Sequence, residues 1–178
     1  CVFGIQSQEQ AMPLEQVMEG LSVRNIGPAG MSGRVTCIAA HPHIATTLYA
    51  GSASGGLWVS ANNGQNWSPL FQNEKVASIG AVAIDPKHPD IIYVGTGEGN
   101  PRNSQTSGYG LYKSYDGGQS WECIGLEQTR TIHRILINPE NTDEIYIGAT
   151  GSAWGDSPRG VFKTTDGGKN LTNSLYID

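Results

Sequence analysis

Charged side chains are scarce in this sequence. Only 15% of its 178 residues are Asp, Glu, Lys or Arg, and the 11 Lys and Arg are outnumbered by 16 Asp and Glu. This composition excludes a charge-rich disordered chain. The formal net charge of -5 also leaves no basic surface for phosphate groups, so we predict no nucleic-acid partner.

Cysteine and long apolar runs are equally limited. Cys1, Cys37 and Cys123 are odd in number and form no Cys-x-x-Cys pair, so neither a disulfide framework nor a zinc site is indicated. We predict no metal and no cofactor. No run approaches the roughly 18 apolar residues of a membrane-spanning helix, and no transmembrane span is predicted.

The first residues differ in character from the rest. Residues 1–8 pass from apolar to small and polar side chains, as the end of a secretory signal does. We therefore predict a signal-peptide remnant over 1–8, a lead-in segment over 9–32, and a protein that is secreted, periplasmic or on the cell surface. A lipid anchor on Cys1 is a second interpretation, which the residues leave open.

Glycine is abundant, with 24 copies, about twice its average share, and this favours turn-dense β structure over helices. One glycine-containing motif recurs at intervals of about 50 residues, which indicates a repeat architecture. Its three copies are Ser60, Asn62, Gly64 and Trp67; Ser114, Asp116, Gly118 and Trp121; and Thr164, Asp166 and Gly168 with Leu171 in the Trp position.

The same order of segments surrounds each motif. Two β-rich runs separated by a His-Pro, Asp-Pro or Asn-Pro turn precede it, then a glycine-rich loop and a third run, and a fourth run follows it. Four strands per repeat predict an all-β fold, a partial β-propeller of antiparallel blades over 33–178. The blades are expected at about 33–71, 79–126 and 132–177. Because propellers close with 4 to 8 blades, we expect a fragment that is completed by the remaining propeller blades of the full-length chain, or assembly with a partner chain.

The Ser/Thr-x-Asp-x-Gly-x-x-Trp spacing resembles the Asp-box, or BNR repeat, of sialidases, xyloglucanase-type endoglucanases and sortilin-group receptors. Residues 24–34 and 95–104 are similar to large secreted bacterial BNR proteins described as sortilin-like or glycosyl-hydrolase-like. This sequence departs from the motif at Asn62 and Leu171. The motif residues themselves are predicted to be structural, with Asp116 and Asp166 accepting hydrogen bonds from the backbone of their own turns.

Residues that bind ligands are expected on the opposite rim, where long loops join the second and third strands and linkers join the blades. The ligand-binding candidates are Asn100, Arg102, Asn103, Arg130, His133 and Trp154. Glu98 and Asp156 are the candidate catalytic carboxylates of this rim. The alternative for the 96–109 loop is that its polar side chains satisfy its own irregular backbone.

Two functions follow from the resemblance. The first is an extracytoplasmic propeller that binds a glycan or a polypeptide. The alternative is a glycoside hydrolase whose catalytic carboxylates lie partly in further blades. The resemblance implies an Asp after the second strand of the first blade in xyloglucanase-type proteins, and this sequence has Ala53 there, which favours binding.

Overall fold

The computed structural model describes residues 34–100, 105–152 and 155–176. The predicted signal remnant and lead-in segment lie outside these ranges, as do Arg102, Asn103 and Trp154. The described residues form twelve strands and one short 3-10 helix, η1 (Glu127–Thr129). The strands are β1 (Val35–Ala40), β2 (Leu48–Ser52), β3 (Leu57–Ser60), β4 (Ser68–Pro69), β5 (Ile79–Ile84), β6 (Ile92–Thr96), β7 (Leu111–Ser114), β8 (Glu122–Gly125), β9 (Ile132–Ile137), β10 (Ile145–Ala149), β11 (Gly160–Thr164) and β12 (Thr172–Tyr176).

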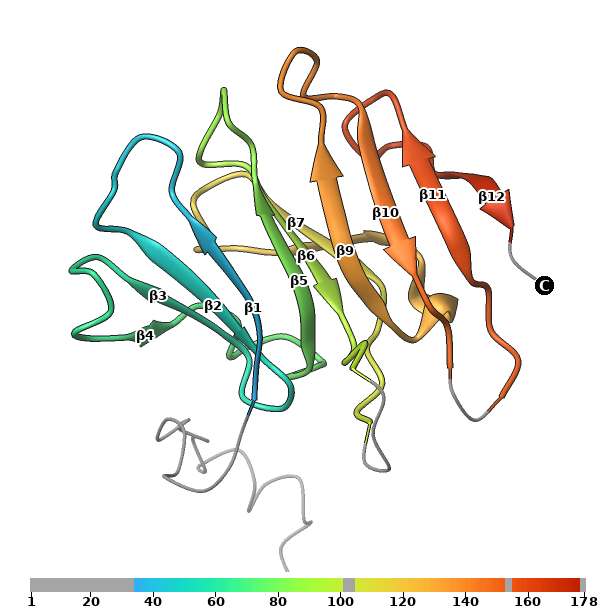
Figure 1. The fold of residues 1–178 in the computed structure, drawn as a ribbon, viewed down its shortest axis with the longest axis horizontal. Coiled ribbons are helices and arrows are strands. Elements are labelled where there is room, and N and C mark those ends of the chain that lie inside the picture. Colours follow the sequence, from blue (N-terminus) through green and yellow to red (C-terminus); the bar gives the residue numbers. More distant parts are fainter. Residues whose placement is uncertain (1–33, 101–104, 153–154, 177–178) are drawn as a thin grey trace, which may run out of the picture.

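These strands form three separate four-stranded sheets. Each sheet is antiparallel and keeps its strands in chain order, β1 to β4, β5 to β8 and β9 to β12. Figure 1 shows the first strands of the sheets, β1, β5 and β9, side by side, with the later strands of each sheet extending away from them. The all-β prediction of three four-stranded blades is confirmed.

The core lies between the sheets. One buried cluster joins Tyr49, Leu57 and Phe71 of the first blade to residues of the second blade such as Ile79 and Ile92. A second cluster joins the second blade to the third in the same manner. The second blade therefore has a front face packed on the first blade and a back face packed on the third, and burial of these faces stabilises the stack.

The Pro-containing turns between the first and second strands are held by their first side chains. Asp85 Oδ1 accepts the N–H groups of Lys87 and His88 at 2.8 and 3.0 Å. His41 Nδ1 and Asn138 Oδ1 accept main-chain N–H groups at the same place in their blades. Short polar side chains thus satisfy backbone donors that a strand no longer uses.

Alternating strand direction sends the connections to two opposite rims (Figure 1). We call one the turn rim; it carries the Pro turns and the three glycine turns, which are residues 60–67, 114–121 and 164–171. We call the other the loop rim; it carries the loops between the second and third strands and the linkers between blades. The ligand-binding candidates that the structure describes, Asn100, Arg130 and His133, belong to the loop rim.

Candidate functional site on the loop rim

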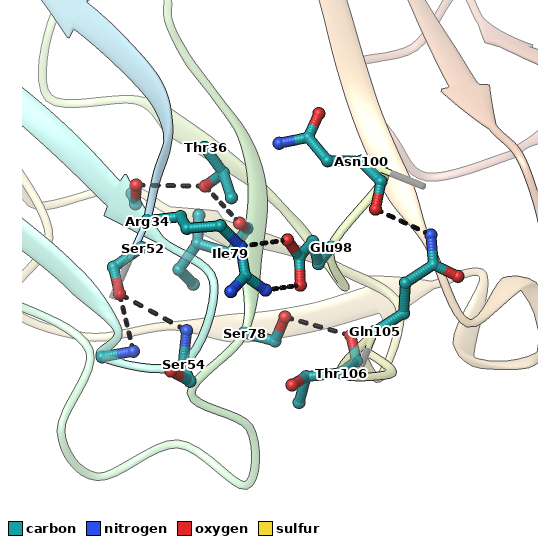
Figure 2. Close-up of polar contacts among 12 residues, drawn as sticks. Arg34, Thr36, Ser52, Ser54, Ser78, Ile79, Glu98, Asn100, Gln105 and Thr106 are labelled. Atoms are coloured by element: carbon teal, nitrogen blue, oxygen red, sulfur yellow. Dashed lines mark hydrogen bonds and ion pairs between the residues drawn. The ribbon is translucent and has the colours of Figure 1, made fainter. Parts of the chain in front are cut away.

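An ion pair on the loop rim joins two blades. Arg34 precedes β1, and Glu98 follows β6 in the second blade. Arg34 Nε donates to Glu98 Oε1 at 2.7 Å, and Nη2 pairs with Oε2 (Figure 2). Glu98 is completely buried, whereas the Arg34 side chain is one-third exposed. Two parallel bonds fix both side chains, as is typical of an arginine–carboxylate pair.

The backbone beside this pair is closely packed. Glu98 N–H donates to Thr106 O at 3.0 Å, and Ser78 Oγ donates to the same carbonyl at 3.1 Å. Gly97 has a φ of 92°, and a Cβ there would lie 2.1 Å from Arg130 O. Only glycine fits this approach. The two ends of the loop between β6 and β7 therefore pack against each other and against the linker residue Arg130.

A bulge recurs at the loop-rim end of each first strand. In the register with the second strand, Thr36, Gly80 and His133 have no opposite residue. Bulges of this kind redirect a side chain. Thr36 Oγ1 donates to Ile79 O of the next blade at 2.5 Å (Figure 2). A Cβ at Gly80 would meet Ile132 O of the next blade at 2.3 Å.

His133 occupies the bulge position of the third blade. Its ring packs against Gly99, where a Cβ would lie 2.5 Å from His133 Cβ. Within the part of the chain that the structure describes, His133 Nδ1 is buried without a hydrogen-bond partner. Burial, with a smaller contribution from the charge of Arg134, lowers the pKa of His133, so the neutral imidazole is favoured.

The other described candidates differ in exposure. Asn100, Arg130 and Asp156 are exposed, so they are available to a ligand. Asn100 also accepts a hydrogen bond from Gln105 Nε2 through its main-chain oxygen at 2.9 Å. Thus the structure brings Glu98, Asn100, Arg130 and His133 to one region, while Asp156 lies on the separate loop between β10 and β11.

Two features of the first blade bear on this rim. Ala53, at the position where an Asp was expected from the resemblance, is buried, and its N–H donates to Arg34 O at 2.9 Å. The second feature is a pocket of about 280 Å³ that Gly56, Pro69, Phe71 and Glu74 help to line. Sequence reasoning missed this pocket because its lining comes from a loop and a linker that are separated by a whole hairpin.

The glycine turns of the opposite rim share one set of hydrogen bonds. In the second blade, Ser114 Oγ donates to Asp116 Oδ1 at 2.8 Å and accepts Gly118 N–H at 2.8 Å, and Asp116 Oδ1 accepts Ser120 N–H at 2.9 Å. The first and third blades repeat the pattern, with Asn62 Oδ1 in the place of the carboxylate oxygen in the first. The amide therefore supplies the acceptor that the turn requires.

Hydrogen bonds also set the acidity of the two turn carboxylates. The side chain of Ser120 and then its backbone N–H hold the pKa of Asp116 at about 2. The backbone N–H of Asn170, followed by its side chain, lowers the pKa of Asp166 to about 2. Both groups are ionised at neutral pH and are committed to their turns.

Among residues 34–100, 105–152 and 155–176, no group of three His, Cys, Asp or Glu side chains could hold a metal ion. No helix in these ranges is long and apolar enough to cross a membrane.

Comparisons with known proteins identify similar sequences and similar folds. No family model matches the chain. An oligoxyloglucan-reducing end-specific xyloglucanase of Emericella nidulans is 29% identical over 129 residues, which are 65% of this chain and 15% of the relative. A xyloglucanase of Hypocrea jecorina is 27% identical over 163 residues, 83% of this chain and 18% of the relative.

Among solved structures, an ancestral GH74 enzyme superposes with a TM-score of 0.65 and 26% identity, covering 79% of this chain and 18% of that structure. The three sheets are blades of a β-propeller. The predicted fold class is thereby confirmed. The chain spans less than a fifth of the length of these three proteins.

Proposed function

We propose that this chain belongs to a glycan-acting propeller of the xyloglucanase type, a glycoside hydrolase, and that its loop rim faces the glycan. The observation that carries the proposal is the similarity, in sequence and in fold, to xyloglucanases and to a GH74 enzyme. It favours the hydrolase over the general binding module that we placed first from the sequence. We further propose the predicted location outside the cytoplasm for the intact protein.

The loop rim suits a glycan in its exposed polar groups. Asn100 and Arg130 supply an amide and a guanidinium that can bind sugar hydroxyl groups, and Asp156 supplies an exposed carboxylate. We assign the glycine turns of the opposite rim a structural role, because their carboxylates are already used within the turn.

Glycoside hydrolysis requires two carboxyl groups roughly 5 to 10 Å apart on either side of the scissile bond. Glu98 does not suit this role, because it is completely buried and paired with Arg34. We therefore propose that Glu98 orders the rim, that Asp156 is the candidate catalytic carboxylate of these blades, and that its partner lies elsewhere in the intact protein.

A binding propeller without hydrolysis is the second candidate. One observation favours it: the loop of the first blade presents the buried Ala53 where the resemblance implies an Asp in xyloglucanase-type proteins. A polypeptide ligand would be compatible with the same exposed groups.

The test uses the intact protein that contains this chain, with xyloglucan oligosaccharides as the probe. Binding is measured by calorimetry and hydrolysis by the release of reducing ends, for the native protein, Asp156→Asn and the turn-rim control Glu140→Gln. We expect hydrolysis that Asp156→Asn abolishes and Glu140→Gln preserves. Binding without hydrolysis in the native protein would establish the second candidate, and the absence of both would overturn the proposal.

A further inference from the structure

The pocket of the first blade is small and lies on the loop rim. It is formed between the loop that joins β2 to β3 and the linker that joins β4 to β5, and its volume is about 280 Å³. Sites for drug-sized ligands have volumes of roughly 300–1,000 Å³. The pocket is therefore suited to a single side chain or to another group of that size.

Two buried apolar residues, Leu57 and Phe71, line the pocket, and we call them its floor. Leu57 is 0% exposed and Phe71 is 3% exposed. The Phe71 ring meets the rings of Tyr112 and Trp121 edge to face, with 5.1 Å between the ring centres in both pairs. Aromatic rings prefer this arrangement, so packing holds the floor in place. An aliphatic chain that lies on the floor leaves water, which favours its binding.

The wall formed by the loop between β2 and β3 already has its main-chain groups bonded. Gly56 N–H donates to Ala77 O at 2.8 Å, and Gly56 O accepts Ser52 N–H at 3.1 Å. Gly55 N–H donates to Ser52 Oγ at 2.7 Å, and Gly55 O accepts Trp58 Nε1–H at 2.7 Å. These bonds set the shape of the wall before any ligand binds, and such preorganisation lowers the cost of binding.

Two polar side chains of the linker, Gln72 and Glu74, also line the pocket. Gln72 is exposed and Glu74 is half-buried. Among the residues that the structure describes, neither side chain forms a hydrogen bond or an ion pair. The adjacent Lys75 does not pair with Glu74, since its Nζ lies over the Tyr109 ring, 5.5 Å from the ring centre. The carboxylate of Glu74 is therefore available to a ligand.

The charge of Glu74 also acts on the aromatic residues behind the floor. Burial, followed by the charges of Cys123 and Glu74, raises the pKa of Tyr112 to about 12. Tyr112 is the ring that packs against Phe71. Opposite charges attract most strongly where little water separates them, so a cation in the pocket is attracted to Glu74.

An apolar floor with one available carboxylate complements an aliphatic chain that ends in a cation. The side chain of lysine has this form, and it can lay its methylene groups on apolar surface while its ammonium stays with a charged partner. A sugar unit fits less well, because its several hydroxyl groups need more polar partners than Gln72 and Glu74. The Gln72 amide both donates and accepts, as a peptide group does, so it suits the main chain that carries the lysine.

We propose that this pocket binds a lysine side chain of a polypeptide partner. The methylene groups of the lysine pack on Leu57 and Phe71, and its ammonium donates to the carboxylate of Glu74. Charge complementarity and the size of the pocket select this occupant. The proposal does not depend on the proposed hydrolysis of a glycan. Its test measures binding alone, so the two proposals can fail separately.

The experiment measures the binding of capped amino acids to the intact protein by saturation-transfer NMR, which detects weak ligands. The probe is lysine with an acetyl and a methylamide cap, and capped norleucine is its uncharged match. We expect lysine to bind at least about tenfold more tightly than norleucine, because a hydrogen bond to a charged group adds that much. Glu74→Gln should remove the difference, whereas the turn-rim control Glu140→Gln should keep it. Ala77→Leu, at an exposed position that lines the pocket, should fill the space and weaken the binding of both probes.

Four results would overturn the proposal. Equal binding of lysine and norleucine to the native protein would show that the charge is not recognised. Lysine binding that survives both Glu74→Gln and Ala77→Leu would place the amine elsewhere on the protein. Butylamine that binds through Glu74 where capped lysine does not would identify a small amine as the occupant. A xyloglucan oligosaccharide whose binding is lost in both variants would make the pocket part of a glycan site.

Discussion

The two rims of the molecule are built on different principles. On the turn rim, the hydroxyl and the Asp or Asn side chain of each glycine turn accept N–H groups from the backbone of the same turn. All of these groups lie within six residues of one another, and the same bonds occur in all three blades. On the loop rim, the principal contact joins Arg34 to Glu98 across two blades and has no copy in the other described loops. Because the repeated hydrogen bonds of the turn rim are the same in every blade, the loops of the loop rim can differ from blade to blade.

The difference between the rims indicates that the turn rim stabilises the fold, whereas the loop rim determines which ligand is bound. Local hydrogen bonds that repeat in every blade hold the strands in place whatever the loops contain. Loops on such a rigid scaffold can diverge, and binding residues concentrate on them. The comparison can be tested by disrupting each rim in turn.

The largest loss of stability is expected where a residue of the loop rim lies directly against the backbone of neighbouring segments. A Cβ at Gly80 would lie 2.2 Å from Gly97 O and 2.3 Å from Ile132 O, whereas at the exposed Gly155 nothing lies within 4 Å. Gly80→Ala should cost more than the roughly 1–3 kcal/mol of an over-packed core, since both obstructing atoms belong to the backbone. Urea unfolding checks this, with Gly155→Ala as the control; equal midpoints for the two variants would contradict it.

The ion pair of the loop rim comes next. Arg34→Met leaves the carboxylate of Glu98 buried without its partner, so the urea midpoint should fall markedly. Adding Glu98→Gln removes the buried charge and should restore part of the loss. A double variant no more stable than Arg34→Met would show that the charge of Glu98 is not the cause.

A smaller loss is expected on the turn rim. Ser114 is buried, and its Oγ accepts Gly118 N–H and donates to Asp116. Ser114→Ala leaves a buried donor unsatisfied and should cost about 1–3 kcal/mol. Thermal or urea unfolding measures the loss, and the exposed loop residue Ser54 supplies the control variant Ser54→Ala. A change no larger than that of Ser54→Ala would rule out a stabilising role for the hydroxyl.

The smallest effect is expected on the stability of the protein at acidic pH. The folded-state pKa of Asp116 and of Asp166, about 2 in each case, lies below the ordinary value near 3.9. Their contribution to stability is therefore present above about pH 4 and is lost as pH falls towards 2. Combining Asp116→Asn with Asp166→Asn should remove this contribution, so that stability falls at pH 7 and depends less on pH in this window, while the turns themselves are kept, since Asn62 already makes the same turn.

Unfolding midpoints between pH 2 and pH 5 check this prediction. The double variant should lose less of its stability on acidification than the native protein does. An unchanged acid dependence would show that other carboxylates control it.

Much of the fold could be predicted from the sequence because its determinants are local. The Pro turns and the glycine turns delimit the strands, and their spacing gave three four-stranded blades. The candidate site was less predictable. From the sequence we expected Glu98 to be a rim carboxylate available for catalysis, but it is buried and paired with Arg34, more than sixty residues earlier in the chain. No local pattern encodes that pairing.

The sequence by itself determined the strand order, the repeated turns and the positions of the loops, because hydrogen bonds between near neighbours and alternating apolar residues specify them. Only the tertiary structure decided which equivalent side chains are buried. Tyr49 and Tyr93 are covered, and Tyr146 is exposed, although the three share one position in their blades. Burial depends on the neighbouring blade, and a repeat carries no local record of whether that neighbour is present.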